Sequence, residues 1–588
     1  MIRLRFVPPF CVVACLVAGT PAAAARPVTA EPAQAPAVTP ADIRFRRDVL
    51  RTGTARQAGL LPGPVAALPG TAASYLEPTP DHPGHPAYAG ATVLAAHHGV
   101  VISRFAVGDA VRYTAGAGGI VELPPGRRVP ARTDTVWDLA SISKLFTTIV
   151  VLQQVEAGRV DLDAPVADHV AEFAAGGKEQ VTVRHLLTHT SGLPAFLPFY
   201  SRYDTPDQRF AAALATPVTA GSAPGRQYVY SDIGLIALGV LIQRVTGESL
   251  ADAVRAGVTG PLGMRDTGYN PGPGQRNRTA ATEYQPDVNR GVVRGEVHDE
   301  NAWSLGGAAG HAGVFSTADD LAVLCQTLLD GGTYRGRRIL SRPMVRQALV
   351  DYNADLRQRY PESARGLGFE LAKHWYMDGM TSPVTFGHTG FTGTSIVIDP
   401  LDQSFLILLS NRVHPDRAWG NNNVARRALA RTFAAAHPIH TPAGGAPWRA
   451  GTRDGAVMTL TAPLRRPAGE RARASFRFWY DTQPVRDTAA VESSADGVTW
   501  VPLPATLRAG RERFTGDGTY TGFGARHWWL AGADVPAGTT RLRFSYRTDA
   551  DSQGRGVLID RLRVFEPGAI LVDGTTTLAA DGWNPVNS

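Results

Sequence analysis

The fold is decided by the stretch Trp137-Asp138-Leu139-Ala140-Ser141-Ile142-Ser143-Lys144, followed by Leu145-Phe146-Thr147-Thr148-Ile149-Val150-Val151-Leu152. Apolar side chains cover most of the circumference of the run that follows Ser141, which predicts a buried helix rather than a surface helix. Residues three positions apart on a helix lie on the same face. Ser141 and Lys144 are therefore expected to lie within reach of each other and to share a proton.

Lys144 brings a titratable amine into this apolar helix. Burial disfavours the ammonium form and is expected to lower the pKa of Lys144, which makes the residue a candidate base or a tuned cation beside a hydroxyl. The chain has only three lysines, at positions 144, 178 and 373, among 59 basic residues, and arginine does not give up its proton in proteins. The alternative is an ordinary helix start whose lysine reaches to solvent, because S-x-x-K is a short pattern.

The first 25 residues have the features of a secretory signal peptide. A basic start, Met1–Arg5, precedes an apolar run too short to span a bilayer, and Ala22–Ala25 offers an A-x-A cleavage site. After cleavage only Cys325 would remain, so no internal disulfide is expected. We expect a secreted, extracytoplasmic protein of the periplasm or cell envelope, without a transmembrane anchor.

The composition is that of a globular protein, with 44% hydrophobic and 19% charged residues. A length of 588 residues allows two or three domains. The net charge of +7 is not gathered into an arginine-rich block, so nucleic-acid binding is not indicated. No pair of histidines has H-E-x-x-H spacing, so neither a metal site nor a cofactor is expected.

The pattern along the chain divides it into five parts. Residues 1–25 are the signal peptide, and the proline-rich residues 26–87 predict an irregular lead-in. Residues 88–436 form the main domain, 437–447 a linker, and 448–588 an all-β module. In the main domain, strands are predicted at Ala91–His97, Val100–Val107, Val384–Gly390, Thr394–Asp399 and Phe405–Leu409. Helices are predicted at Val183–Leu187, Ile233–Val245, Leu321–Leu329 and Asn423–Ala436.

Strands at both ends of the main domain with helices between them favour an α/β (α+β) fold. We expect one antiparallel sheet flanked by helices, with a helical subdomain inserted in the middle. The C-terminal module alternates with period two at Ala474–Tyr480, Ala489–Ser493 and Thr540–Tyr546, which predicts a β-sandwich.

Two further motifs follow Ser141 and Lys144 in a characteristic order. Tyr230-Ser231-Asp232 precedes an apolar helix, and His388-Thr389-Gly390 lies in a predicted strand. This series resembles the serine β-lactamase and penicillin-binding-protein superfamily, in the class C-like branch that also contains DD-peptidases and carboxylesterases. The resemblance covers roughly residues 88–436, and the segments Thr182–Leu193 and Gly306–Thr317 also resemble loops of that family.

The resemblance implies a role for each motif residue. Ser141 would attack the acyl carbon, while Lys144 and Tyr230 move its proton. Asp232 would bond Lys144 or a substrate amide, and His388, Thr389 and Gly390 would form part of the substrate-binding strand. The backbone N–H groups of Ser141 and Phe391 would form the oxyanion hole.

Two positions depart from the family pattern. Asp232 replaces the usual Asn, and its negative charge is expected to keep Lys144 protonated and to shift the base role toward Tyr230. His388 replaces the usual Lys, so at pH 7 the site lacks the cation that grips a substrate carboxylate. We expect acidification below about pH 6.5 to charge His388 and to improve KM for carboxylate-bearing substrates.

The sequence therefore predicts an exported serine hydrolase that acts on a small-molecule or peptide acyl substrate through an acyl-enzyme. A D-Ala-D-Ala carboxypeptidase is favoured by export and by the resemblance, and a carboxylesterase is favoured by His388. A third class, a non-catalytic penicillin-binding or cell-wall-binding protein, is opposed by the presence of Ser141, Lys144 and Tyr230 together.

The C-terminal module resembles the jelly-roll modules that are appended to secreted hydrolases. Adjacent tryptophans on one strand face opposite ways, so Trp528 and Trp529 cannot both be buried in the core. With Arg526 and His527 beside them, they form a candidate platform for sugar rings. We expect residues 448–588 to be dispensable for hydrolysis of a small ester and to retain the protein on envelope polysaccharide.

Overall fold

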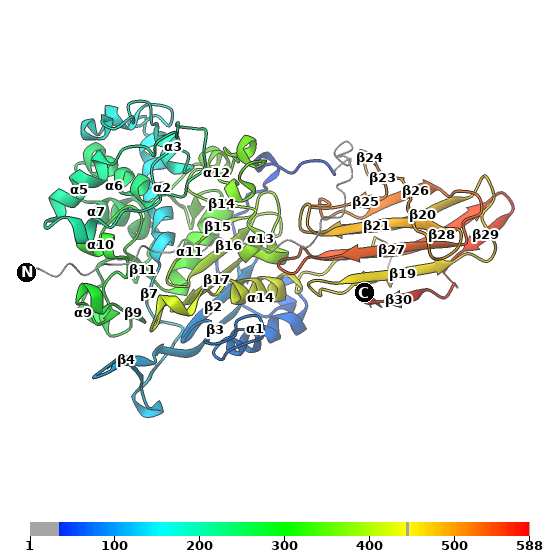
Figure 1. Ribbon diagram of the computed structural model, residues 1–588, viewed down its shortest axis with the longest axis horizontal. Helices are drawn as coiled ribbons and strands as arrows, with labels where there is room; N and C mark the ends of the chain where they lie inside the picture. The colour runs from blue at the N-terminus through cyan, green and yellow to red at the C-terminus, as the bar shows by residue number, and fades with distance from the viewer. Residues whose placement is uncertain (1–34, 443–445, 575, 587–588) are drawn as a thin grey trace, which may run out of the picture.

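An antiparallel sheet lies at the centre of the N-terminal part of the molecule (Figure 1). The computed structural model describes residues 35–442, 446–574 and 576–586, so the expected signal peptide lies outside the described residues. The strand order is β1-β3-β2-β17-β16-β15-β14, and every neighbouring pair is antiparallel except β1 with β3. The strands are β1 (Arg51–Thr52), β2 (Gly90–His97), β3 (Val100–Val111), β14 (Glu370–Leu371), β15 (Phe386–Thr389), β16 (Ser395–Asp399) and β17 (Ser404–Ser410).

Both faces of this sheet are buried because helices cover each of them. Alternate residues of a strand point to opposite faces: in β2, Leu94 and Ala96 belong to one hydrophobic cluster, while Val93 and Ala95 belong to another. The helices of the first cluster include α2 (Ser143–Glu156) and α11 (Ala318–Leu329). Those of the second are α1 (Pro62–Ser74) and α14 (Asn423–Ala434). The predicted α/β class with a central antiparallel sheet is confirmed.

The lead-in 26–87 is not irregular throughout, because residues 62–74 form helix α1, which packs against α14 and β3. Two of its prolines lie in the first turn, where a missing N–H costs nothing, and Pro69 faces solvent. The buried face carries Val65, Leu68 and Ala72. The spacing of these three apolar residues is typical of a helix, but the prolines of the segment led to the prediction of irregular structure.

A helical subdomain covers one end of the sheet (Figure 1). Its main helices are α3 (Val183–Leu187), α5 (Pro206–Ala215), α6 (Asp232–Thr246), α7 (Leu250–Val254) and α10 (Glu300–Ser304). Helix α6 is almost entirely buried and packs against α2. In the described part of the chain, no single helix is long and apolar enough to cross a membrane. The consecutive helical segments Asp232–Thr246 and Leu250–Leu262 reach that length and apolarity only when they are taken together, and they are bent by 80° relative to each other.

The C-terminal module is a β-sandwich, as the period-two pattern predicts. Its first sheet has the order β24-β23-β26-β20-β28-β18-β31 and its second β22-β21-β27-β19-β30. The longest strands are β19 (Val457–Pro463), β20 (Arg473–Asp481), β21 (Thr488–Ser494), β26 (Trp529–Asp534), β27 (Arg541–Arg547) and β28 (Gly556–Glu566). Alternate aromatic residues, including Phe478, Phe544 and Tyr546, fill the core between the sheets.

The proposed sugar platform at Trp528 and Trp529 is wrong. Trp529 is fully buried in the sandwich core, whereas half-buried Trp528 donates its indole N–H to the carbonyl of His440 at 2.9 Å. Arg526 points into the contact between the two domains. As expected, the two tryptophans are not both buried, but Trp528 lies just before strand β26 and contacts the linker.

Arg526 joins the sandwich to the sheet through buried carboxylates. Its Nη1 lies 2.7 Å from Asp399 and 2.8 Å from Asp402, both at the β16–β17 turn. Burial alone would raise the pKa of Asp402, but Arg526 and Arg555 together lower it. Arg555, from the same module, also pairs with both carboxylates. Residues 448–588 therefore supply the cations that neutralise Asp399 and Asp402, while their dispensability for hydrolysis of a small ester stays a prediction.

Replacing Arg526 by Leu should lower the free energy of unfolding by about 3–5 kcal/mol, because it leaves buried carboxylates without their partner. Arg473→Leu is the matched control, since the Arg473–Asp534 ion pair of the same domain is exposed, and it should change that free energy by less than about 1 kcal/mol. Chemical denaturation measures both. Equal stability of the two variants would show that the Arg526 contact does not hold the domains together.

Candidate active site

Ser141 lies in a single 3₁₀ turn, Ala140–Ile142, which leads directly into α2. Lys144 occupies the first turn of α2, and its Nζ donates a 2.8 Å hydrogen bond to the Oγ of Ser141. A second hydrogen bond, of 3.1 Å, runs from the same Nζ to the carbonyl oxygen of His311. The predicted proximity of Ser141 and Lys144 is confirmed, although Ser141 precedes the α-helix rather than lying within it.

The turn that contains Ser141 has a strained backbone. Ala140 has φ = +46°, a left-handed conformation that is uncommon for residues other than glycine. The carboxylate of Asp138 holds this conformation, because it accepts hydrogen bonds from the N–H of Ala140 at 2.8 Å and from the N–H of His298 at 2.6 Å. Such strain persists only where surrounding contacts enforce it, and it is concentrated at functional sites.

Lys144 is buried, with 1% of its side chain exposed, and it forms an ion pair of 2.8 Å with Asp232. Burial alone would lower the pKa of Lys144, but the charge of Asp232, followed by that of Tyr230, raises it above the ordinary value for lysine. The expectation that burial leaves Lys144 with a lowered pKa is therefore wrong, whereas the expectation that Asp232 keeps Lys144 protonated is confirmed. Lys144 is an ammonium ion that donates to Ser141.

Tyr230 stands beside this ammonium, with its ring centroid 5.0 Å from Nζ of Lys144. On its other sides lie the ring of His189, at 4.5 Å between centroids, and the guanidinium carbon of Arg365, at 5.3 Å. Burial raises the pKa of Tyr230, and the positive charges of Lys144 and Arg365 oppose that rise. His189 also holds the loop, because its Nδ1 accepts the N–H of Ser231 at 3.0 Å.

The loop after β15 is pressed against the Ser141 turn. The hydroxyl of Thr394 donates to the carbonyl of Leu139 at 3.0 Å, and that of Thr392 donates to the carbonyl of Asp138 at 2.7 Å. A Cβ atom at Gly390 would lie only 2.1 Å from the Thr394 hydroxyl and 2.3 Å from the Leu139 carbonyl. Only glycine therefore allows this close approach at position 390.

Two buried arginines hold the carbonyl groups of this loop. Arg412 donates through Nε to the carbonyl of Phe391 at 2.7 Å. Arg426 donates through Nη2 to the carbonyls of Gly390 at 2.9 Å and Thr394 at 2.8 Å. With these carbonyls fixed, the peptide planes of the loop are fixed as well, so Phe391 presents its backbone N–H from a rigid support.

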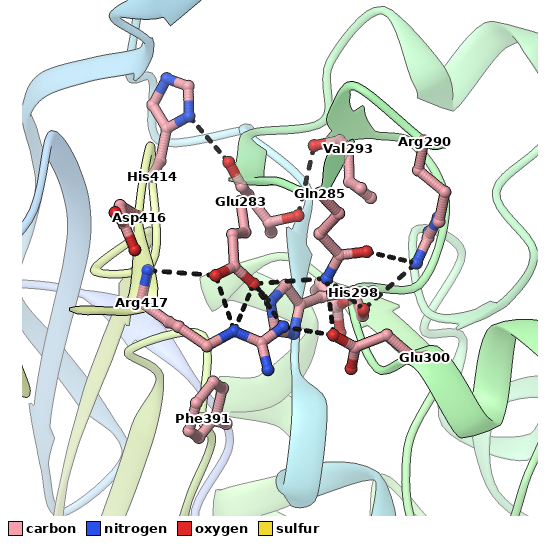
Figure 2. Close-up of polar contacts among 12 residues, drawn as sticks. Glu283, Gln285, Arg290, Val293, His298, Glu300, Phe391, His414, Asp416 and Arg417 are labelled. Atoms are coloured by element: carbon pink, nitrogen blue, oxygen red, sulfur yellow. Dashed lines mark hydrogen bonds and ion pairs between the residues drawn. The ribbon is translucent and has the colours of Figure 1, made fainter. Parts of the chain in front are cut away.

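The side chain of Phe391 lies against a network of ion pairs (Figure 2). Its ring centroid is 4.1 Å from the guanidinium carbon of Arg412 and 5.7 Å from the ring of His298. Arg417 and His298 both bond the buried carboxylate of Glu283, at 2.6 and 2.8 Å. Burial would raise the pKa of Glu283, but these two bonds lower it to about 2. Glu283 thus remains charged at neutral pH, and its ion pair with Arg417 supports the cavity wall at Phe391.

His388 does not occupy the place that the resemblance implies for a substrate-binding cation. Its side chain is 1% exposed, and its Nδ1 donates to the carbonyl of Thr389 at 2.7 Å. Burial, which Glu370 only partly opposes, lowers the pKa of His388 to about 4. The expected charging of His388 near pH 6.5 is therefore wrong, because the ring is neutral throughout the physiological range.

A cavity of about 450 Å³ opens beside the Ser141 hydroxyl. Its walls include the predicted residues Ser141, Tyr230, Thr389, Gly390 and Phe391. Its other lining residues were not predicted: Tyr228, Glu362, Glu370, Lys373, Trp375, Arg412, Asn421, Asn423 and Arg426. Among these, only Lys373 carried a signal in the sequence, since lysine is so rare in this chain. The arrangement offers a hydroxyl, an adjacent ammonium and a phenol in one cavity, which suits acyl transfer.

Gly390→Ala should lower kcat for an activated ester about a hundredfold, because the added methyl group displaces the loop that carries the Phe391 N–H. Gly118→Ala is the control, since a Cβ at Gly118 meets no other atom within 4 Å. Steady-state kinetics of the two variants provide the comparison. An unchanged kcat for Gly390→Ala would mean that the loop position is not critical.

KM for a carboxylate-bearing substrate should show no improvement between about pH 7 and 5.5, because His388 remains neutral over the range in which an ordinary histidine titrates. His388→Asn preserves a donor for the Thr389 carbonyl and should give a profile of the same shape. A fall in KM on acidification that appears in the wild type and is lost in the Asn variant would contradict the neutral assignment.

Comparison with known proteins agrees with this geometry. The beta-lactamase family profile matches residues 80–431. A protein of Escherichia coli O157:H7 named "Putative D-alanyl-D-alanine carboxypeptidase" is 32% identical over 364 residues, which are 56% of this chain and 79% of the relative. A protein of the same name from Salmonella agona is 33% identical, over 48% of this chain and 71% of the relative.

Among solved structures, a penicillin-binding protein homologue from Caulobacter crescentus is similar, with 24% identity and a TM-score of 0.48, covering 64% of this chain and 99% of that one. The family profile extends over more than half of the chain and contains Ser141, Lys144, Tyr230 and His388. The chain belongs to the beta-lactamase family and is a serine hydrolase of its class C-like branch.

Proposed function

We propose that this serine hydrolase is a D-Ala-D-Ala carboxypeptidase that acts through an acyl-enzyme on Ser141. The observation that carries the proposal is the 2.8 Å hydrogen bond from Lys144 to the Ser141 hydroxyl at the wall of the cavity. The names of the curated relatives from Escherichia coli and Salmonella support the peptide substrate. The expected signal peptide would place the enzyme outside the cytoplasm, beside cell-wall peptides.

The reaction has two steps. In the first, the Ser141 oxygen bonds to the carbonyl carbon of the penultimate D-Ala, and the peptide C–N bond breaks to release D-Ala as an amine that takes up a proton. In the second, water cleaves the ester and restores the hydroxyl. The backbone N–H groups of Ser141 and Phe391 would stabilise the oxyanion of each tetrahedral intermediate, on the loop that Gly390 keeps close to the serine.

Tyr230 is the proposed proton acceptor. Lys144 cannot accept the serine proton while Asp232 keeps it as an ammonium. Burial keeps the pKa of Tyr230 above its ordinary value, so the residue is a phenol in the free enzyme, although the positive charges of Lys144 and Arg365 partly oppose that rise. Tyr230 would then act as a relay that takes the proton of Ser141 while its own phenol proton passes to the leaving amine.

A second candidate is a carboxylesterase, because the third motif has a neutral histidine at position 388 in place of a cation. A site that needed no carboxylate contact would favour neutral esters. Both candidates form an ester on Ser141, and they differ in the acyl group that the serine retains and in the group that leaves.

Intact-mass spectrometry and D-Ala release distinguish the candidates. The wild type should release D-Ala from an N-acyl-D-Ala-D-Ala peptide and form a penicilloyl adduct, and Ser141→Ala should lose more than about a thousandfold in kcat. Ser201→Ala, which alters an exposed serine away from the cavity, is the matched control and should behave as the wild type. Ester hydrolysis and a fluorophosphonate adduct without any release of D-Ala would overturn the peptidase proposal in favour of the esterase.

A further inference from the structure

Lys373 is a second lysine in the wall of the cavity that contains Ser141. It follows β14 and immediately precedes the short helix α13 (His374–Met377), and it is 3% exposed. The third lysine, Lys178, has a structural role, because its Nζ donates to the carbonyls of Ala175 and Thr216 at 2.5 and 2.6 Å. Lys373 thus remains as a lysine at the site to which the mechanism assigns no role.

The partners of Lys373 in the protein leave N–H donors of its ammonium group available for a ligand. Its Nζ donates to the backbone carbonyl of Glu362 and lies 3.9 Å from the carboxylate of the same residue. An ammonium group has three N–H donors. The Glu362 side chain is 72% exposed, so its carboxylate is free to turn into solvent when another anion takes its place.

Each of the other cations around the cavity has at least one partner that is held in place. Lys144 faces Asp232 at 2.8 Å, and Arg365 faces Glu370 at 3.2 Å. Arg412 and Arg426 donate to backbone carbonyls of the loop that follows β15. A negatively charged ligand in this cavity therefore finds in Lys373 the cation whose carboxylate partner is most easily displaced.

We propose that Lys373 binds the free carboxylate of the leaving group and so makes the enzyme selective for substrates with an anionic C-terminal residue. The proposal rests on the proposed function and adds the residue that recognises the terminal D-Ala. Lys373 would supply, from a different position in the chain, the positive charge that is missing at His388.

The charges around Lys373 predict a pH dependence. Burial, together with the neighbouring positive charge of Arg365, lowers the pKa of Lys373 to about 8, while Glu370, Glu362 and Asp351 partly oppose this shift. Below that pH the residue is an ammonium and binds a carboxylate. Above it the charge is lost, so kcat/KM for an anionic substrate should fall as the pH rises through about 8, with no matching fall for a neutral substrate.

A pair of thiolesters tests the proposal: N-acetyl-D-alanyl mercaptoacetate, whose leaving group is anionic, and its methyl ester, whose leaving group is neutral. The measured quantity is the ratio of their kcat/KM values. Lys373→Met should lower this ratio about tenfold to a hundredfold, the loss typical of a hydrogen bond to a charged group. Arg359→Met, which removes an exposed cation outside the cavity lining, should leave the ratio within about twofold of the wild type.

Lys373→Arg keeps the positive charge. This second variant tests the proposal even if the protein does not fold with Met at position 373. The ratio should stay near that of the wild type, and its fall above pH 8 should disappear, since arginine stays protonated. An unchanged ratio in Lys373→Met, or the same alkaline fall in Lys373→Arg, would overturn the proposal.

The two proposals fail in different ways. If the wild type releases no D-Ala from the peptide but the thiolester ratio depends on Lys373, the peptidase function is wrong and the carboxylate contact stands. If D-Ala is released and the ratio does not depend on Lys373, the peptidase function stands and the carboxylate contact is wrong.

Discussion

The buried ammonium of Lys144 is the constraint on which the rest of the site depends. A charge with 1% exposure is costly unless it is paired and hydrogen-bonded. Its partners come from three separate segments: Ser141 on the turn before α2, Asp232 at the start of α6, and the carbonyl of His311 in the loop before α11. The same contacts that stabilise the ion therefore hold the sheet side and the helical subdomain together around the cavity.

Much of the fold could be predicted because its signals are local. Helix α3 was predicted at Val183–Leu187, where the structure has it, since Thr182 caps it and apolar residues fill one face. Strands β16 and β17 read as apolar runs because both of their faces are buried. The order of Ser141, Tyr230 and His388 along the chain was sufficient to predict that the three motifs lie close together in the fold.

The remaining features depend on contacts between distant segments. Burial alone predicted a lowered pKa for Lys144 and the Asp232 motif predicted the opposite shift, and only the contact between Asp232 and the Lys144 Nζ decides between them. His388 lies in the expected strand, yet its burial follows from the packing around β15. Helix α1 was hidden by its prolines, and Arg526 appeared to belong to a surface because nothing in the turn before β26 indicates Asp399 and Asp402. Local periodicity predicts which face of a helix or strand is buried, but it does not predict which residues of distant segments contact that face.

The contact of Arg526 with Asp399 has a consequence for how the protein is made. The two residues are 127 positions apart, and the carboxylate comes first. Because the chain is synthesised in order, the turn between β16 and β17 is complete before its counter-ions exist, so its carboxylates must stay hydrated or protonated until the turn that carries Arg526 has been made. The neutralisation of Asp399 and Asp402 thus waits for the last quarter of the polypeptide.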